Sequence, residues 1–264
     1  MEIVLITGGS SGIGAATAKV LARAGMKVYA GSRRGTATEA HPGIVPIKLD
    51  VNNAETLKAA VEQILEADGK LDAVICNAGN GIYGPVEYTT EEDARAQFET
   101  CYFGALKTIQ ACLPVFRKQG HGRIITVTSV MAVLQLPFQV FYSSAKAAML
   151  SLTEGLRMEL KGTDIQCCSI LPGDVATGFT QARKVNAVEG TPYDKAVEKN
   201  LRKIEKDELG GMKPEVIAKA ILKQLRKKRM SVRVIPRIDY KAVGLLARIL
   251  PESWKLSLIN ALYS

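Results

Sequence analysis

The chain has 264 residues, of which 47% are apolar and 23% are charged, so it can bury a core of ordinary globular size. Its five cysteines are odd in number and lack Cys-x-x-Cys spacing, and it has only two histidines, which argues against both a disulfide framework and a metal site. No apolar run reaches the roughly 18 residues that span a bilayer, and no basic-then-apolar leader precedes the first apolar run, so we expect a soluble, cytoplasmic protein.

The net charge of +9 comes from one segment of the chain. Between Lys213 and Arg248 there are eleven Lys and Arg residues against two acids, and the rest of the chain is balanced. Because the excess is confined to this segment and no nucleic-acid reader motif accompanies it, we expect no nucleic-acid partner. A solvated helix face explains the segment best. An acidic partner, an anionic substrate or peripheral contact with an anionic membrane stays open.

Short apolar runs alternate with longer amphipathic stretches along the whole chain. The runs predict strands at residues 3–6, 27–30, 45–49, 73–76, 123–127, 165–171 and 231–235. The stretches predict helices over residues 13–24, 54–67, 91–117 (two helices in series), 142–160 and 214–228. Since the strand candidates are continuously apolar, they should be covered on both faces. This pattern indicates an α/β fold, a doubly wound parallel sheet of about seven strands in a single domain, residues 1–264.

Two segments depart from this alternation. Residues 177–213 are less regular and carry many charges, which is typical of a substrate lid. The C-terminal extension, residues 236–264, has apolar residues at helical spacing from Leu245 to Leu262. Core packing, a dimer contact and membrane contact explain that spacing about equally well.

A glycine-rich turn follows the first predicted strand directly and opens onto the first predicted helix. Its sequence is Thr7-Gly8-Gly9-Ser10-Ser11-Gly12-Ile13-Gly14. Glycines let the backbone turn sharply and approach a pyrophosphate, and the helix N-terminus offers free N–H groups and a positive dipole end to the anion. The position between strand and helix therefore predicts a dinucleotide site rather than a plain turn.

The end of the second predicted strand lacks the acidic residue that is typical of an NAD site. The sequence there is Ser32-Arg33-Arg34. A carboxylate would bond the ribose 2′-hydroxyl and repel a 2′-phosphate, whereas arginine binds phosphate bidentately. We therefore predict NADP as the cofactor. The alternative is that one arginine is only a solvated loop charge.

A tyrosine and a lysine lie four residues apart in the sequence Tyr142-Ser143-Ser144-Ala145-Lys146. On a helix this spacing puts both side chains on one face, where the ammonium should lower the pKa of the phenol. Ser129 lies at the end of the fifth predicted strand, the sheet edge at which doubly wound folds bind ligands. Its hydroxyl is placed to bond a substrate oxygen as charge develops there.

These motifs together resemble those of the short-chain dehydrogenase/reductase superfamily over almost the full chain, in particular its NADP-dependent hydroxysteroid- and retinol-dehydrogenase-like members. The resemblance implies a Rossmann-type fold. It implies that Tyr142 is the general acid or base, that Lys146 lowers its pKa and binds the nicotinamide ribose, and that Ser129 orients the substrate carbonyl. The implied cofactor-binding residues are Gly8, Ser10, Ser11, Gly12, Ile13, Gly14, Ser32, Arg33, Arg34, Asp50, Val51, Asn77, Ala78, Gly79, Tyr142, Lys146, Pro172, Gly173, Val175 and Thr177.

One position departs from the family pattern. An asparagine usually stands three residues before the glycine of an Asn-x-x-Gly segment, and here the segment is Cys101-Tyr102-Phe103-Gly104. In the family this asparagine helps to hold a water that connects the lysine to solvent, through its main-chain carbonyl and a local helix irregularity. Because any residue keeps that carbonyl, we expect a working, altered proton relay.

The resemblance implies an NADP(H)-dependent oxidoreductase that interconverts a secondary alcohol and a ketone, acting as a homodimer or homotetramer on a small molecule. Apolar residues after Ser129, together with Phe179 and Tyr193 in the lid, favour a hydrophobic, steroid-, retinoid- or lipid-like substrate. Two alternatives stay open. One is a 3-oxoacyl carrier-protein reductase. The other is a non-catalytic NADP-binding regulatory or scaffold protein, which Cys101 supports and the intact Ser129, Tyr142 and Lys146 oppose.

Overall fold

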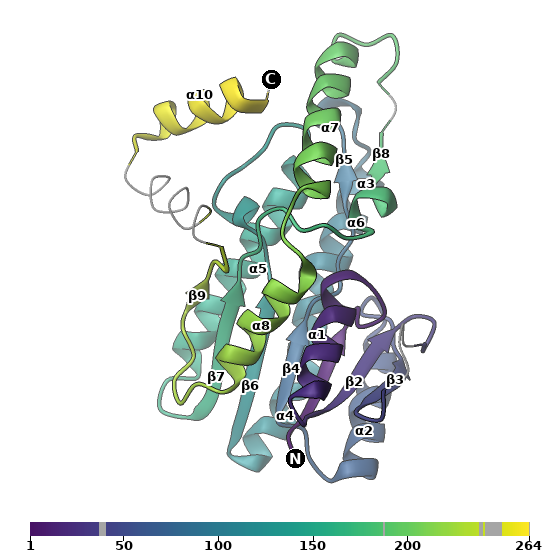
Figure 1. Ribbon diagram of the computed structural model, residues 1–264, viewed down its shortest axis with the longest axis vertical. Coiled ribbons are helices and arrows are strands. Elements are labelled where there is room, and N and C mark those ends of the chain that lie inside the picture. Colours follow the sequence, from purple (N-terminus) through teal and green to yellow (C-terminus); the bar gives the residue numbers. More distant parts are fainter. Residues whose placement is uncertain (37–40, 187, 238–239, 241–249, 264) are drawn as a thin grey trace.

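The computed structural model describes residues 1–36, 41–186, 188–237, 240 and 250–263. Seven parallel strands form one sheet in the order β3-β2-β1-β4-β6-β7-β9 (Figure 1). These strands are β1 (Ile3–Thr7), β2 (Lys27–Ser32), β3 (Ile44–Lys48), β4 (Ala73–Cys76), β6 (His121–Val127), β7 (Asp164–Ile170) and β9 (Arg233–Val234). The order reverses at β1 and β4, so their carboxyl ends open the crevice in which such sheets bind ligands.

Helices cover both faces of this sheet, and the alternation of side chains along β1 shows why. Val4 and Ile6 pack in one apolar core with Leu21 of α1 (Gly12–Arg23) and Ile221 of α8 (Pro214–Leu225). Leu5 points the other way, into a second core that holds the inner faces of α2 (Ala54–Asp68), α4 (Gly104–Gln119) and α5 (Val140–Glu159). Strands buried on both sides favour apolar residues at successive positions, as in β1, where Ile3 to Ile6 are all apolar and only the last residue, Thr7, is polar.

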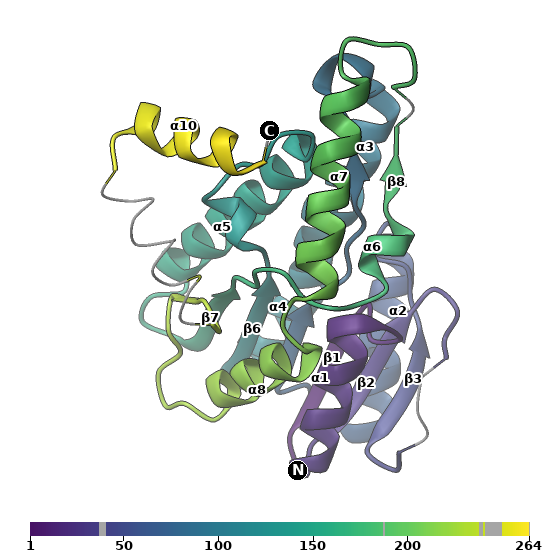
Figure 2. The same ribbon diagram turned by 45° about the horizontal axis from the view of Figure 1, so that its top comes forward.

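The remaining elements gather above the carboxyl ends of the strands (Figure 2). A two-stranded parallel sheet joins β5 (Ile82–Tyr83) to β8 (Lys184–Val185). The other elements are η1 (Val86–Tyr88), α3 (Glu91–Phe98), η2 (Glu99–Phe103), η3 (Val130–Ala132), α6 (Phe179–Ala182), α7 (Asp194–Leu209) and α10 (Glu252–Tyr263). In Figure 1 the N-terminus lies at the opposite end of the molecule from α10.

The predicted fold class, the single seven-stranded sheet and the helix positions are confirmed, with shifts at the ends. The helix predicted to residue 228 ends at Leu225, and the last strand has two residues instead of five. The expectation of an irregular segment at 177–213 is wrong in part, because α7 occupies sixteen residues of it. Its narrow buried stripe, Val197 and Ile204, is hidden among charges in the sequence.

The basic side chains of this segment are mostly exposed where the structure describes them, and its densest run lies far from the crevice. Arg226, Lys228 and Arg229 are exposed, just after α8 ends. The Lys228 carbonyl accepts a hydrogen bond of 2.9 Å from Gln166, near the start of β7. This run therefore lies at the amino ends of the strands, and it does not supply positive charge to the crevice. Of the predicted apolar helical spacing from Leu245 to Leu262, residues 245–249 lie outside the described residues, and the remainder leads into α10.

Within the described residues, no helix combines the length and apolarity that crossing a bilayer requires. The same residues contain no group of His, Cys, Asp and Glu side chains able to hold a metal ion.

Candidate active site

A cavity of about 630 Å³ opens at the carboxyl ends of the central strands. Its walls come from the glycine loop before α1, the residues that follow β4, β6 and β7, one face of α5, the segment around α6, and α10. Such a volume lies in the range of small-ligand and cofactor sites. The crevice predicted from the sheet order is thus a real pocket, and its walls combine segments far apart in the sequence.

The glycine loop packs so closely that side chains would block it. Gly8 has φ +67°, and a Cβ there would lie 2.9 Å from the Cα of Ala78. A Cβ on Gly14 would lie 2.1 Å from the carbonyl oxygen of Gly8. Ser11 is the extended N-cap residue of α1, and its side chain makes no capping hydrogen bond. Ser11, Gly12 and Ile13, where the helix begins, line the pocket, which fits the phosphates of a dinucleotide.

Asn77 holds this loop against the neighbouring strand. Its Nδ2 donates to the carbonyls of Thr7 and Gly8, each at 3.1 Å. The Thr7 hydroxyl in turn accepts from the backbone N–H groups of Asn77 and Ala78, at 3.1 and 3.2 Å. Asn77 thus fixes the shape of the phosphate loop as well as lining the pocket.

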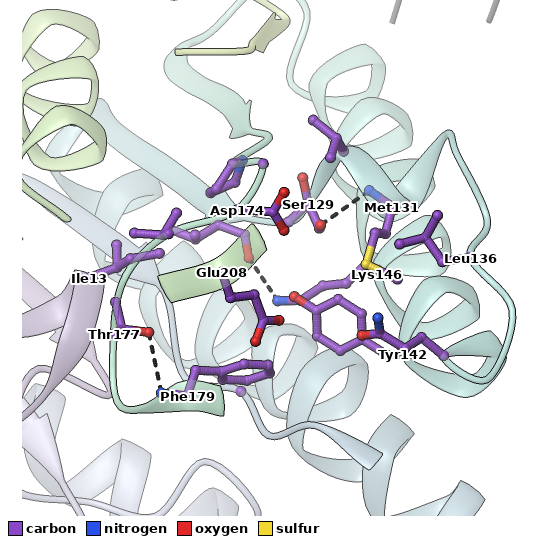
Figure 3. A pocket seen from close by; sticks show the side chains of 18 of the residues that line it. Ile13, Ser129, Met131, Leu136, Tyr142, Lys146, Asp174, Thr177, Phe179 and Glu208 are labelled. Carbon is purple, nitrogen blue, oxygen red and sulfur yellow. Dashed lines mark hydrogen bonds between the residues drawn. The ribbon is translucent and has the colours of Figure 1, made fainter. Parts of the chain in front are cut away.

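The three residues of the predicted catalytic set meet on one wall (Figure 3). Tyr142 and Lys146 lie one turn apart on α5, and the Lys146 Nζ lies 5.6 Å from the centre of the Tyr142 ring. Lys146 is buried and donates a 2.9 Å hydrogen bond to the carbonyl of Val127, the last residue of β6. Ser129 follows β6, and its hydroxyl accepts from the N–H of Met131 at 3.1 Å. Strand β6 thus holds both the lysine and the serine.

The expected lowering of the Tyr142 pKa is wrong for the protein on its own. Burial of the hydroxyl raises the pKa of Tyr142, and the hydrogen bond with Ser129 only partly offsets this. Burial also lowers the pKa of Lys146, because its ammonium loses water without gaining a carboxylate partner. The phenol is therefore held protonated, the form that can donate a proton to a substrate oxygen.

Cys101 lies inside the helix irregularity that the resemblance implied. Residues Glu99–Phe103 form a π-helical turn between α3 and α4, in which the Gly104 N–H donates to the Glu99 carbonyl. The Cys101 side chain is fully buried beside the pocket. A Cβ on Gly79 would lie 3.5 Å from its Sγ and 3.7 Å from the Lys146 Nζ. The Cys101 thiol and the Lys146 ammonium therefore both lie close to Gly79.

The short chain dehydrogenase family model matches residues 2–187, more than two thirds of the chain. The chain belongs to the short-chain dehydrogenase family. It is 36% identical over 258 residues to the 3-ketodihydrosphingosine reductase of Bacteroides thetaiotaomicron, across 96% of this chain and 93% of that protein.

Solved structures agree. A short-chain dehydrogenase from Streptomyces avermitilis superposes with a TM-score of 0.85 at 28% identity, over 98% of this chain and 97% of that one. A short chain dehydrogenase from Burkholderia cenocepacia in complex with NADP superposes with a TM-score of 0.74 at 27% identity, over 95% and 100%. The chain is thus a short-chain dehydrogenase-type oxidoreductase with a nicotinamide nucleotide as its supported cofactor.

The structure brings most of the predicted site residues of this short-chain dehydrogenase to the pocket wall. They are Gly8, Ser11, Gly12, Ile13, Asn77, Ala78, Gly79, Ser129, Tyr142, Lys146, Pro172, Gly173, Val175 and Thr177. The wall does not include Ser10, Gly14, Ser32, Arg33, Arg34, Asp50 and Val51. Of these, Ser32 ends β2, the two arginines follow it, and Asp50 and Val51 follow β3, to the side of the glycine loop; both arginines are exposed.

The apolar part of the wall matches the sequence expectation only in part. Val130, Met131, Leu134 and Leu136 line the pocket. Phe179 does as well, with its ring 5.8 Å from that of Tyr142. The expectation for Tyr193 is wrong: its ring packs on Tyr88 and Phe138, at centroid distances of 5.9 and 6.3 Å, away from the pocket wall.

Several further features of the wall were not predicted. Asp174 and Glu208 bring carboxylates to it, and Tyr240 brings a phenol from the C-terminal extension. Asp174 directly follows the Pro172-Gly173 motif, and this position was the one feature of the sequence that could have placed it at the pocket. Nothing in the sequence singles out Glu208, because it lies among the many charged residues of α7. The α10 residues Leu258, Ile259 and Tyr263 also line the pocket, and only their helical apolar spacing hinted at a buried role.

Proposed function

We propose that this short-chain dehydrogenase is an NADPH-dependent reductase of a ketone carried on a long apolar chain. The observation that carries the proposal is the length of apolar wall beyond Tyr142. It begins at Met131 and Leu136 near the catalytic set and continues to Leu258 and Ile259 of α10. An apolar chain gains about 0.8 kcal/mol for each methylene it buries. The likeness to a 3-ketodihydrosphingosine reductase supports this substrate class.

The preference for NADPH rests on the end of β2. Gly31, its next-to-last residue, accepts a 2.9 Å hydrogen bond from the N–H of Gly9 in the phosphate loop. Arg33 therefore lies two residues, and Arg34 three residues, after Gly31, whose backbone contacts this loop. Both arginine side chains are exposed. Arginine there attracts a 2′-phosphate, and no acidic side chain occupies the last position of β2 to repel it.

The bound cofactor supplies the hydride in such a reaction. Tyr142, with its raised pKa, donates a proton to the carbonyl oxygen of the substrate. Ser129 orients that oxygen by a hydrogen bond and stabilises the charge that develops on it. Lys146 holds its ammonium at the end of β6, below the phenol, where it attracts the negative charge left on Tyr142 after transfer.

Chain length tests the proposal directly. A series of ketones of increasing alkyl length is compared by the oxidation of NADPH. The kcat/KM is expected to rise about threefold to fourfold with each methylene, until the wall is filled. Leu258→Asp should flatten this dependence, because its charge interrupts the wall, whereas Leu209→Asp, on an exposed leucine outside the pocket, should not. A rate independent of chain length, or a preference for sugars, would contradict the proposal.

The same assay separates the alternatives. A 3-oxoacyl thioester included in the series tests the carrier-protein reductase reading. The scaffold reading requires that no ketone in the series be reduced although NADPH binds, and the convergence of Ser129, Tyr142 and Lys146 on one wall argues against it.

A further inference from the structure

Asp174 places a carboxylate in the wall of the catalytic pocket without a cation beside it. One oxygen accepts a hydrogen bond from the Tyr240 hydroxyl, and the Asp174 N–H donates to the same hydroxyl at 3.2 Å. Among the described residues, no lysine or arginine forms an ion pair with it. A half-buried carboxylate that has only neutral partners gains most from a positively charged ligand.

The cations near the pocket make contacts elsewhere, and the Arg237 guanidinium lies 5.8 Å from the centre of the Tyr240 ring. Arg183 is buried and pairs with Glu208, whose other oxygen accepts from Thr180 at 2.6 Å. Lys146 donates to the Val127 carbonyl, and Lys255 on α10 pairs with Glu252. Burial and the charges of Glu208 and Asp207 all raise the pKa of Asp174. Glu208 and Asp207 thus add negative charge near Asp174, and a cation arriving with the substrate would offset it.

Asp174 also lies close to where the carbonyl of a substrate must bind. It stands two residues after Pro172, whose carbonyl accepts a 2.8 Å hydrogen bond from the N–H of Val130, the neighbour of Ser129. Figure 3 shows the Asp174 and Ser129 side chains on the same side of the pocket. A substrate oxygen held by Ser129 therefore brings the atoms bonded to its carbonyl carbon toward the carboxylate.

We propose that Asp174 binds an ammonium group that the substrate carries on the carbon beside its reacting carbonyl. The substrate is then a long-chain amino ketone, and Asp174 sets its selectivity against neutral ketones. This inference rests on the proposed function. Tyr240 acts as a positioning residue, because its hydroxyl holds one carboxylate oxygen and leaves the other for the ammonium.

Kinetics with three matched substrates test the inference. They are a long-chain 2-amino ketone, the same ketone without the amine, and its N-acetyl derivative, which has no charge. The wild type should prefer the amino ketone at least tenfold in kcat/KM over either neutral compound, and Asp174→Asn should abolish this preference. Asp174→Ser checks the result should the asparagine variant misfold. Asp164→Asn removes an exposed carboxylate at the other end of β7 and should leave the preference unchanged.

Binding separates this inference from the proposed function. A long-chain 2-amino alcohol and the matched alcohol without the amine are titrated calorimetrically into the protein with NADPH present. The wild type should bind the amino alcohol at least tenfold more tightly than the matched alcohol. The Asp174→Asn variant should bind the two compounds with equal affinity. If no ketone is reduced but this difference holds, the proposed function fails and the ammonium site stands. Equal binding of both alcohols to the wild type, or a preference that survives Asp174→Asn and Asp174→Ser, overturns the inference.

Discussion

The Sγ atom of Cys101 lies 3.1 Å from the Nε2 atom of Gln97, one turn earlier in the chain. The same amide donates to the carbonyl of Asn80 at 2.9 Å, and its oxygen accepts from the N–H of Ile82 at the same distance. Cys101 thus packs within a hydrogen-bonded cluster that connects the π-helical turn to the segment after Gly79. Its side chain therefore has a structural role there.

We therefore expect Cys101→Ala to lower stability more than activity. Loss of a fully buried thiol should cost about 1 kcal/mol of unfolding free energy. Turnover should stay within about threefold, because every residue keeps the carbonyl. Cys101→Asn restores the usual family residue and should keep or raise turnover under reducing conditions. A collapse of activity in both folded variants, measured beside their melting temperatures, would show that the thiol itself takes part.

Tyr142→Phe removes the proton donor and nothing else. Turnover should be lost while NADPH binding, followed by fluorescence titration, stays nearly intact. Lys146→Ala should reduce both, because its ammonium is implied to serve the phenol and the cofactor ribose. Since burial raises the pKa of Tyr142, ketone reduction should keep its rate to well above neutral pH. A Phe variant with substantial turnover would remove Tyr142 from the mechanism.

Cofactor selectivity should depend on the arginines after β2. Arg33→Asp introduces a charge that repels the 2′-phosphate, so the ratio of the NADPH and NADH dissociation constants should fall by at least tenfold. Arg226→Asp, which makes the same change at an exposed site at the amino ends of the strands, is the control. Equal affinity of the unmodified protein for the two cofactors would refute the preference.

Asp174→Asn should raise the melting temperature at neutral pH. The pKa of Asp174 is raised by folding, so ionising this carboxyl costs more in the folded than in the unfolded chain. The cost is absent at a pH below the ordinary aspartate value and complete above the raised one. The variant should thus gain stability over the wild type as pH rises through this window. A constant difference in melting temperature across the window would show that Asp174 is not destabilising.

We expect a homodimer or homotetramer, built through α4 and α5. Two large apolar side chains near these helices are exposed in the single chain, Phe103 at 41% and Met158 at 74%. Replacing both with glutamate should shift sedimentation toward the monomer. Sedimentation of the unmodified protein as a monomer at micromolar concentration would contradict the expectation.

The sequence predicts what local chemistry determines. Glycines that a Cβ would block, the Tyr142–Lys146 spacing and the continuous apolar strands each have one structural solution, and all are found in place. Contacts between distant segments leave no such signal. The pairing of β5 with β8 involves only two residues in each strand, too few to give a strand pattern in the sequence. The contact of α10 with the pocket depends on how the whole chain folds, which the local sequence pattern of α10 does not specify.

The Tyr142 pKa shows the same limit in another form. The spacing of Tyr142 and Lys146 is correct, yet it says nothing of how deeply the phenol is buried. Burial raises this pKa more than the hydrogen bond with Ser129 lowers it, and the Phe179 ring lies 5.8 Å from that of Tyr142. The prediction that Tyr193 lines the pocket fails for a related reason. An aromatic residue in a lid can equally well pack on neighbouring aromatic rings, here those of Tyr88 and Phe138.

The position of α10 has a practical consequence for handling the protein. Tyr263 lines the pocket, and its carbonyl accepts a hydrogen bond from Asn200 on α7. An affinity tag joined to the C-terminus would start beside the substrate wall and compete with this contact. Met1 is exposed and lies at the other end of the molecule (Figure 1). Purification handles and surface-immobilisation chemistry therefore belong at the N-terminus.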